Sequence, residues 1–161
     1  MIKQQHNFLF EEYNSADELK QDDAFLLNEA RSATQFAYAP YSNFQVGAAA
    51  KLINGEVVIG SNQENASYPV GICAERVLLS SASSQYPNIA IDTIAISYNN
   101  MKGTSNTPAS PCGICRQTIS EYQERGKRAI RLILSGMEGK VIIVSNAADL
   151  LPLSFSAEDM K

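Results

Sequence analysis

Apolar residues recur along the chain with two different periods, which divide it into helical and extended segments. Over residues 17–37 they recur at intervals of three, four and seven, and this spacing places them on one face of an α-helix. Residues 44–53 and 56–61 have β-strand character, and the Asn54-Gly55 pair between them favours a tight hairpin turn. The first half of the chain is therefore predicted to form a helix followed by an antiparallel hairpin.

The second half of the chain continues the alternation of helix and strand. Helical spacing covers residues 73–84 and returns near residue 112, where Ser110 is a suitable N-cap. The basic run RGKR at residues 125–128 is expected to end this second helix. Strands that alternate with helices predict an α/β domain built in layers. The other expected elements are strands at 89–98, 129–135 and 140–145 and a short helix at 147–151.

Two regions lack a regular apolar pattern. Residues 1–14 are polar and unpatterned, so we interpret them as an N-terminal extension. Residues 99–111 are rich in Asn, Gly, Ser, Thr and Pro and are expected to form a loop. Because 161 residues suffice for one hydrophobic core, residues 15–161 are predicted to form a single domain.

The composition narrows the class of partner. The chain is 45% hydrophobic and 19% charged, as in an ordinary globular protein, and its net charge is -4. An acidic chain without a basic stripe argues against a nucleic-acid partner, because nucleic acids are bound through clustered Lys and Arg. We therefore expect a small, weakly charged ligand.

The chain also lacks the patterns of membrane insertion and secretion. No apolar run approaches the roughly 20 residues that cross a bilayer, so no membrane partner is expected. The start, MIKQQHNFLFEEYNS, has neither the apolar core nor the cleavage site of a signal peptide. A cytoplasmic location is expected, where cysteines remain thiols or bind metal rather than form disulfides.

The three cysteines lie in two short motifs, Cys73 in VGICAER and both Cys112 and Cys115 in SPCGICRQ. Cys112 and Cys115 are three residues apart and share one face of the expected helix. Helix N-termini stabilise thiolates, so two helix starts would present three thiolates to one zinc ion. The only histidine, His6, lies in the extension, and three protein ligands with an open fourth position are typical of catalytic zinc. Water in that position would have its pKa lowered by the metal.

Two charged residues follow Cys73 in the same helix. Glu75 is a candidate catalytic residue, because a carboxylate beside metal-bound water takes a proton from it and passes the proton to a substrate nitrogen. Taken alone, Glu75 would only be an acid that favours the first turn of a helix. Arg76 lies on the same helical face as Cys73, and we expect it to hydrogen-bond a thiolate and offset the charge of the three sulfur atoms.

This constellation resembles the zinc-dependent nucleobase deaminases, whose signature is His or Cys-x-Glu followed by Pro-Cys-x-x-Cys. Four segments of the chain are similar, in order, to the small homotetrameric cytidine deaminases with three cysteine ligands. The similarity runs from about residue 17 to the C-terminus, through APYSNFQVGAAA, NQENASYPVGICAER, SPCGICRQ and LLPLSFSAEDM. It implies a three-layer α-β-α sandwich around a mixed five-stranded sheet, a zinc cofactor, and a homotetramer whose pockets are shared between subunits.

The resemblance also implies a reaction and a role for individual residues. The reaction is the deamination of cytidine and deoxycytidine to uridine, deoxyuridine and ammonia, in which zinc-bound hydroxide attacks ring carbon 4. Cys73, Cys112 and Cys115 match the zinc ligands, and Glu75 matches the proton shuttle. Phe44 matches an aromatic residue that packs on the pyrimidine ring, and Asn62 and Glu64 match the pair that hydrogen-bonds the ribose hydroxyls. Asn65, Ala66 and Tyr68 lie in a segment that lines substrate pockets and subunit contacts in the family. Phe155 matches an aromatic residue that the C-terminus contributes to a neighbouring subunit's pocket.

Each substrate contact has a structural alternative in the sequence alone. Phe44 also fits a core aromatic at a strand start, Asn62 and Glu64 fit a loop that faces water, and Phe155 fits a tail anchor. Only their order relative to the cysteine motifs favours the functional interpretation.

The sequence leaves alternative functions open. The loop at 99–109 is longer than in the family and Ile114 replaces a smaller residue, so a modified cytosine nucleoside such as blasticidin S is an alternative substrate. A non-catalytic binding module stabilised by zinc is a more remote alternative. A redox pair at CGIC is another, although it leaves Cys73 and Glu75 without a role.

Overall fold

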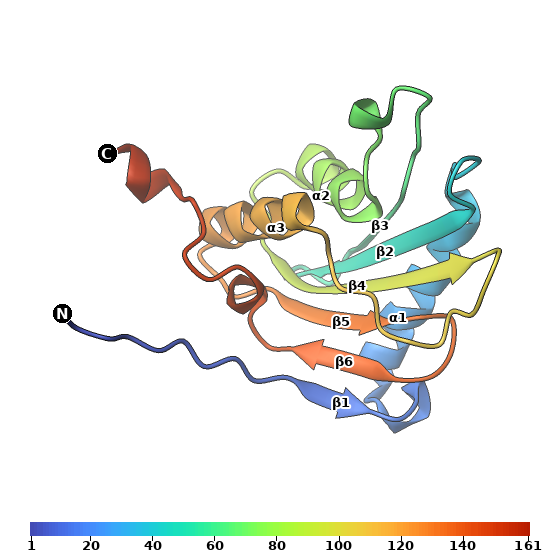
Figure 1. Cartoon of the computed structure of the whole chain (residues 1–161), viewed down its shortest axis with the longest axis horizontal. Coiled ribbons are helices and arrows are strands. Elements are labelled where there is room, and N and C mark those ends of the chain that lie inside the picture. The colour runs from blue at the N-terminus through green and yellow to red at the C-terminus, as the bar shows by residue number, and fades with distance from the viewer.

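A mixed sheet of six strands forms the centre of the computed structural model, which describes residues 1–161 (Figure 1). The strand order is β1-β6-β5-β4-β2-β3. β4 and β5 run parallel, and every other neighbouring pair is antiparallel. The strands are β1 (Glu11–Tyr13), β2 (Phe44–Leu52), β3 (Val57–Ser61), β4 (Ile91–Asn100), β5 (Arg131–Ser135) and β6 (Val141–Val144).

Three helices cover the two faces of this sheet. α1 (Gln21–Ala33) packs on one face, and α2 (Ala74–Gln85) and α3 (Gly113–Gly126) lie on the other (Figure 1). Alternate side chains of β2 explain the layers: Ala49 belongs to the buried cluster under α1, whereas Ala48 and Ala50 belong to the cluster under α2 and α3. The predicted three-layer α/β fold is confirmed. No helix in the structure is long and apolar enough to span a membrane.

Two glycines of the central hairpin allow the helices to approach the sheet closely. A β-carbon on Gly60 would lie 2.5 Å from the backbone nitrogen of Leu78 and 2.6 Å from the carbonyl oxygen of Ala74, both in α2. On the opposite face, a β-carbon on Gly47 would collide with backbone atoms of α1. The absence of a side chain at Gly60 therefore sets the distance between the sheet and the first half of α2.

Most predicted elements occur with small changes in their bounds. The helix expected at 17–37 is α1 with a 3-10 turn on either side, at Ala16–Glu18 and Thr34–Phe36. The hairpin is confirmed, and Gly55 in its turn has a φ of 90°. The RGKR run does end α3, because Lys127 adopts the left-handed conformation directly after it.

The expected N-cap of α3 was wrong. Cys112, not Ser110, occupies the N-cap position with an extended backbone, and the helix begins at Gly113. The side chain of Cys112 makes no capping hydrogen bond, because its sulfur atom faces the other two cysteines. The preference of N-caps for hydroxyl groups is overridden here by the cysteine cluster.

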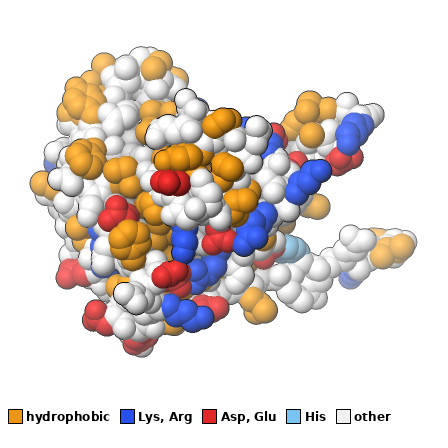
Figure 2. Space-filling model, turned by 180° about the vertical axis from the view of Figure 1, so that it is seen from behind, with side chains coloured by type: hydrophobic (Ala, Val, Ile, Leu, Met, Phe, Trp, Pro, Cys, Tyr) orange, Lys and Arg blue, Asp and Glu red, His pale blue; other side chains and the backbone are white.

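The sheet also has one strand more than the five predicted. β1 comes from the N-terminal extension and pairs with β6. Its side chains gave no strand pattern because Glu11 and Glu12 are exposed and only Tyr13 packs against the cluster under α1. An ion pair of 2.6 Å between Lys140 and Glu12 fastens it to the start of β6. Residues 1–10 form an extended arm that leads away from β1 to the N-terminus (Figure 1) and forms the lower of the two projections in Figure 2.

Replacing Gly60 by alanine is expected to lower the free energy of unfolding by about 1–3 kcal/mol, because the methyl group would be forced into packed backbone. Chemical denaturation measures this loss. Gly113→Ala is the matched control, since a β-carbon there meets no atom within 4 Å. Equal stabilities for the two variants would contradict the close contact between β3 and α2.

Candidate active site

The starts of α2 and α3 bring the three cysteines together. Cys73 is the N-cap of α2, Cys112 is the N-cap of α3, and Cys115 lies in the first turn of α3. The Sγ atoms of Cys73 and Cys112 are 3.9 Å apart, and those of Cys112 and Cys115 are 3.4 Å apart. All three sulfur atoms lie within 4.8 Å of one another. Because Cys115 is buried and Cys112 is exposed, the cluster is closed toward the core and open toward solvent.

This spacing of sulfur atoms fits a zinc ion. Zinc–thiolate bonds of about 2.3 Å in a tetrahedron place neighbouring sulfur atoms about 3.8 Å apart. The distances of 3.4 and 3.9 Å lie on either side of that value. Thiolates are also ligands that zinc prefers. The residues present therefore suit zinc, with one coordination position left for a non-protein ligand.

The thiols of the cluster hold their protons unequally. The hydrogen bond with Cys115 is the main cause that lowers the pKa of Cys73 to about 6, and Arg76 contributes through its charge. The same hydrogen bond, together with burial, raises the pKa of Cys115. A divalent metal that binds all three as thiolates has to displace protons. A direct hydrogen bond from Arg76 to a thiolate stays a prediction.

Glu75 is the second residue of α2, in its first turn, and only 5% of its surface is exposed. Burial is the main cause that raises the pKa of its carboxyl group, because a buried site disfavours the charged form. A carboxyl group with a raised pKa binds a proton more readily than an exposed one, as a group that accepts and releases protons requires.

A cavity of about 310 Å³ opens beside the cysteines, which is within the size range of small-molecule sites. Glu75 and two of the cysteines, Cys73 and Cys112, line it. The structure thus brings the candidate proton shuttle and most of the candidate substrate contacts into one space. The predicted residues that line it are Phe44, Asn62, Glu64, Tyr68, Cys73, Glu75 and Cys112.

Phe44 reaches this cavity from the start of β2, and the structure supports it in two ways that the sequence did not indicate. Its ring stacks on Tyr98 of β4, with centroids 4.7 Å apart and planes inclined by 13°. The side-chain amide of Asn62 holds the strand below it: Nδ2 donates to the carbonyl of Phe44 at 3.0 Å, and Oδ1 accepts from the N–H of Val46 at 2.7 Å.

Glu64 is held at the mouth of the cavity by the backbone. Its Oε2 atom accepts hydrogen bonds from the N–H groups of Tyr41 at 2.9 Å and Ser42 at 3.3 Å. Hydrogen bonds from Ser42 and Tyr41 lower the pKa of Glu64, so its carboxylate is ionised at neutral pH. Both bonds use Oε2, which leaves Oε1 for another donor.

The other predicted contacts lie outside this cavity or at its rim. Tyr68 is 74% exposed and lines both this cavity and a neighbouring one of about 350 Å³, where Asn65 also lies. Ala66 is exposed beside them. Phe155 is 61% exposed in the C-terminal tail and lines neither cavity of its own chain. Within one chain, the structure does not bring Phe155 or Ala66 to the cysteines.

Two residues outside the predicted set of site residues hold the segments of the site in place. The side-chain amide of Gln63 donates to the carbonyl of Phe36 and the hydroxyl of Ser61, both at 3.1 Å. Arg116, which directly follows Cys115, donates to the carbonyls of Pro111 at 2.8 Å and Leu150 at 3.0 Å. Arg116 therefore fixes the segment that leads into Cys112. Only its position next to a ligand could have drawn attention to it.

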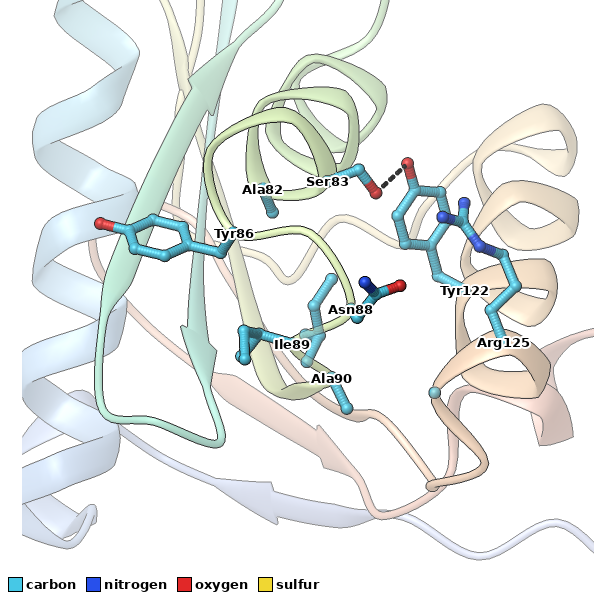
Figure 3. Close-up of a pocket in the computed structure, with 10 residues that line it drawn as sticks. Ala82, Ser83, Tyr86, Asn88, Ile89, Ala90, Tyr122 and Arg125 are labelled. Carbon is cyan, nitrogen blue, oxygen red and sulfur yellow. Dashed lines mark hydrogen bonds between the residues drawn. The ribbon is translucent and has the colours of Figure 1, made fainter.

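A third, smaller cavity of about 90 Å³ lies between the C-terminal ends of α2 and α3, away from the cysteines (Figure 3). The hydroxyl of Ser83 donates to the hydroxyl of Tyr122 at 3.0 Å across it, and the guanidinium of Arg125 lies 4.6 Å from the centre of the Tyr122 ring. No cysteine or carboxylate lines it. It therefore lacks the groups that the chemistry requires.

The fold and the site together define a class of protein. A three-cysteine cluster and a buried glutamate at two helix starts, over one face of a mixed sheet, are the features of zinc-dependent deaminases. Residues 20–130 match the family model for the cytidine and deoxycytidylate deaminase zinc-binding region. The chain belongs to this family, and the predicted zinc cofactor is confirmed.

Individual relatives agree with this assignment. The chain is 38% identical to a cytidine deaminase from Halalkalibacterium halodurans, over 86% of this chain and 98% of that protein. It is 39% identical to the crystal structure of a cytidine deaminase from Burkholderia pseudomallei, with a TM-score of 0.71, covering 85% of this chain and 100% of that one. A more distant relative, a blasticidin-S deaminase from Bacillus cereus, is 27% identical over 86% of this chain and 95% of that protein.

Replacing Cys115 by alanine is expected to abolish stoichiometric zinc binding, because two thiolates cannot complete the site. Elemental analysis of the purified protein measures the zinc content, which should be one ion per chain in the wild type. Glu75→Gln is the matched control in the same site and should retain its zinc. Full zinc content in Cys115→Ala would contradict the three-cysteine site.

Proposed function

We propose that this protein catalyses the hydrolytic deamination of cytidine and deoxycytidine to uridine and deoxyuridine, with release of ammonia, in pyrimidine salvage. The observation that carries the proposal is the buried carboxyl group of Glu75 beside the three-cysteine cluster, in a cavity that Phe44, Asn62 and Glu64 also line. Relatives that are named cytidine deaminases and are 38–39% identical to the chain support it.

The chain's own residues supply the proton transfers of this reaction. Cys73, Cys112 and Cys115 would hold zinc, which when bound lowers the pKa of a water molecule. Glu75 accepts the proton that this water loses and passes it to ring nitrogen 3 of the substrate. When carbon 4 gains its oxygen and loses the amino group, Glu75 carries a second proton to the departing nitrogen. Water and cytidine are thereby converted to uridine and ammonia.

The other lining residues account for binding of a nucleoside. Phe44 offers an aromatic surface for the pyrimidine ring. We assign the ribose hydroxyls to Asn62 and to Glu64, whose Oε1 atom is not used by the backbone bonds. The ionised carboxylate of Glu64 would repel a 5′-phosphate, and no Lys or Arg lines the cavity to offset that repulsion. This charge pattern favours a nucleoside over a nucleotide.

We further propose that the active form is a cytoplasmic homotetramer. Phe155 and Ala66 are exposed and lie outside the cavity of their own chain, so a neighbouring subunit would bring them to a shared pocket. Residues 15–161 then form the deaminase unit, and residues 1–14 are an addition to it. Arg76 is assigned to a thiolate of the cluster.

Glu75→Gln is expected to reduce turnover of cytidine by about 10²–10⁴-fold or more, since glutamine cannot carry a proton, while zinc content stays unchanged. The loss of cytosine absorbance measures the rate, with and without a zinc chelator. Cytidine, deoxycytidine, their 5′-monophosphates and blasticidin S are compared as substrates of the wild type. Turnover of blasticidin S alone would replace the proposed substrate, and wild-type rates for Glu75→Gln would overturn the mechanism.

Phe155→Ala is expected to raise the KM for cytidine several-fold, because a shared pocket loses one aromatic wall. Light scattering coupled to size exclusion measures the oligomer, which should be a tetramer in the wild type. Leu153→Ala is the control, since Leu153 is an apolar residue of the same tail and is even more exposed than Phe155. A monomeric wild type with full activity would refute the shared pocket.

A further inference from the structure

Tyr98 forms the surface on which Phe44 rests. It lies on β4 with 6% of its surface exposed, and its ring is nearly parallel to that of Phe44 at a centroid distance of 4.7 Å. Phe44 lines the cavity, whereas Tyr98 does not. The Tyr98 ring therefore limits how far the Phe44 ring can retreat from a bound ligand.

The loop between β4 and α3 fixes Tyr98 in turn. The hydroxyl group of Tyr98 lies 3.2 Å from Oγ1 of Thr107, within hydrogen-bond distance. A few residues further along the same loop, Ala109 and Ser110 line the cavity, and Cys112 follows. One loop thus connects the support of Phe44, a wall of the cavity and a cysteine of the cluster.

The base of this loop is fastened to the sheet. The hydroxyl of Ser105 accepts a hydrogen bond from the N–H of Asn100 at 2.8 Å, and its carbonyl accepts one from the N–H of Glu138 at 3.2 Å. Gly136 and Gly139 make this contact possible, because a β-carbon on either one would collide with the backbone of residues 105–106. The sheet and its β5–β6 turn therefore set the position of the loop that contains Thr107.

We infer that Tyr98 and Thr107 are positioning residues for the substrate base, acting through the ring of Phe44. This inference rests on the proposed function, because it assumes that Phe44 packs against the pyrimidine. Neither residue is part of the cysteine cluster or lines the cavity with Glu75. Their loss should weaken binding of substrate and transition state equally, which raises KM and leaves kcat unchanged.

Tyr98→Leu removes the stacked ring and is expected to raise the KM for cytidine about 3- to 10-fold, with kcat within about 2-fold of the wild type. Tyr98→Phe and Thr107→Val remove only the hydrogen bond, and each should raise KM about 2- to 4-fold. Because both variants break the same bond, the double variant should have the KM of either single variant. These two variants keep the ring or the side-chain shape, so they test the inference even where Tyr98→Leu folds poorly.

Tyr122→Phe is the matched control. It removes the hydroxyl group from another hydroxyl–hydroxyl bond, that of Ser83 with Tyr122 at 3.0 Å, which lies between the C-terminal ends of α2 and α3 (Figure 3). Its KM and kcat should both equal those of the wild type. Zinc content, measured in parallel, should stay at one ion per chain in every variant.

The outcomes separate this inference from the proposed function. A wild type that deaminates cytidine while the KM of all three Tyr98 and Thr107 variants stays unchanged overturns the inference alone. A fall in kcat together with a loss of zinc also overturns it, because the residues would then act on the metal site. Absence of turnover in the wild type contradicts the proposed function. Calorimetric titration with cytidine then tests the inference by itself. A raised Kd in the variants supports the inference, and an unchanged Kd or no binding overturns it.

Discussion

Three sulfur atoms from two separate helices have to meet at one ion, and the position of both helices follows from this requirement. Gly60 brings β3 into backbone contact with α2, which places Cys73 at a fixed height above the sheet. Arg116 ties the segment before α3 to the C-terminal part of the chain, which fixes Cys112. Both helices begin with a cysteine where a hydroxyl or carboxylate cap would be more stable. Each helix therefore lacks the stabilisation of a side-chain cap, because its N-cap cysteine belongs to the metal site.

The same geometry explains the environment of the acid. Glu75 lies in the first turn of α2, two residues after a cysteine of the cluster, and its carboxyl group is buried beside the sulfur atoms. Burial then raises its pKa, whereas Glu64, at the rim and bonded to backbone N–H groups, has its pKa lowered. Two glutamates of one cavity are thereby given different chemistry by position alone: one suited to proton transfer and one to hydrogen bonding as an anion.

Features coded by neighbouring residues were predictable from the sequence, and features that depend on strand register were not. The Asn54-Gly55 turn and the cysteine motifs are local patterns, and the hairpin and cluster appear where they were expected. The stacking of Phe44 on Tyr98 joins residues 54 positions apart and requires the pairing of β2 with β4. β1 escaped prediction because its exposed acidic residues carry no alternating pattern, and Ser110 was misassigned because a cysteine took the N-cap.

This division between local and long-range features has a consequence for recognition. The local motifs specify the metal site and the proton carrier, which any cytosine substrate requires. Other walls of the cavity come from the loop before α3 and the segment after β3, which are held in place by hydrogen bonds of Ser105 and Gln63. Glu64 makes this part of the cavity acidic, because its carboxylate is ionised and no Lys or Arg lines the cavity to balance it. A change of substrate within this fold would therefore begin in these two segments, with the cysteines and Glu75 retained.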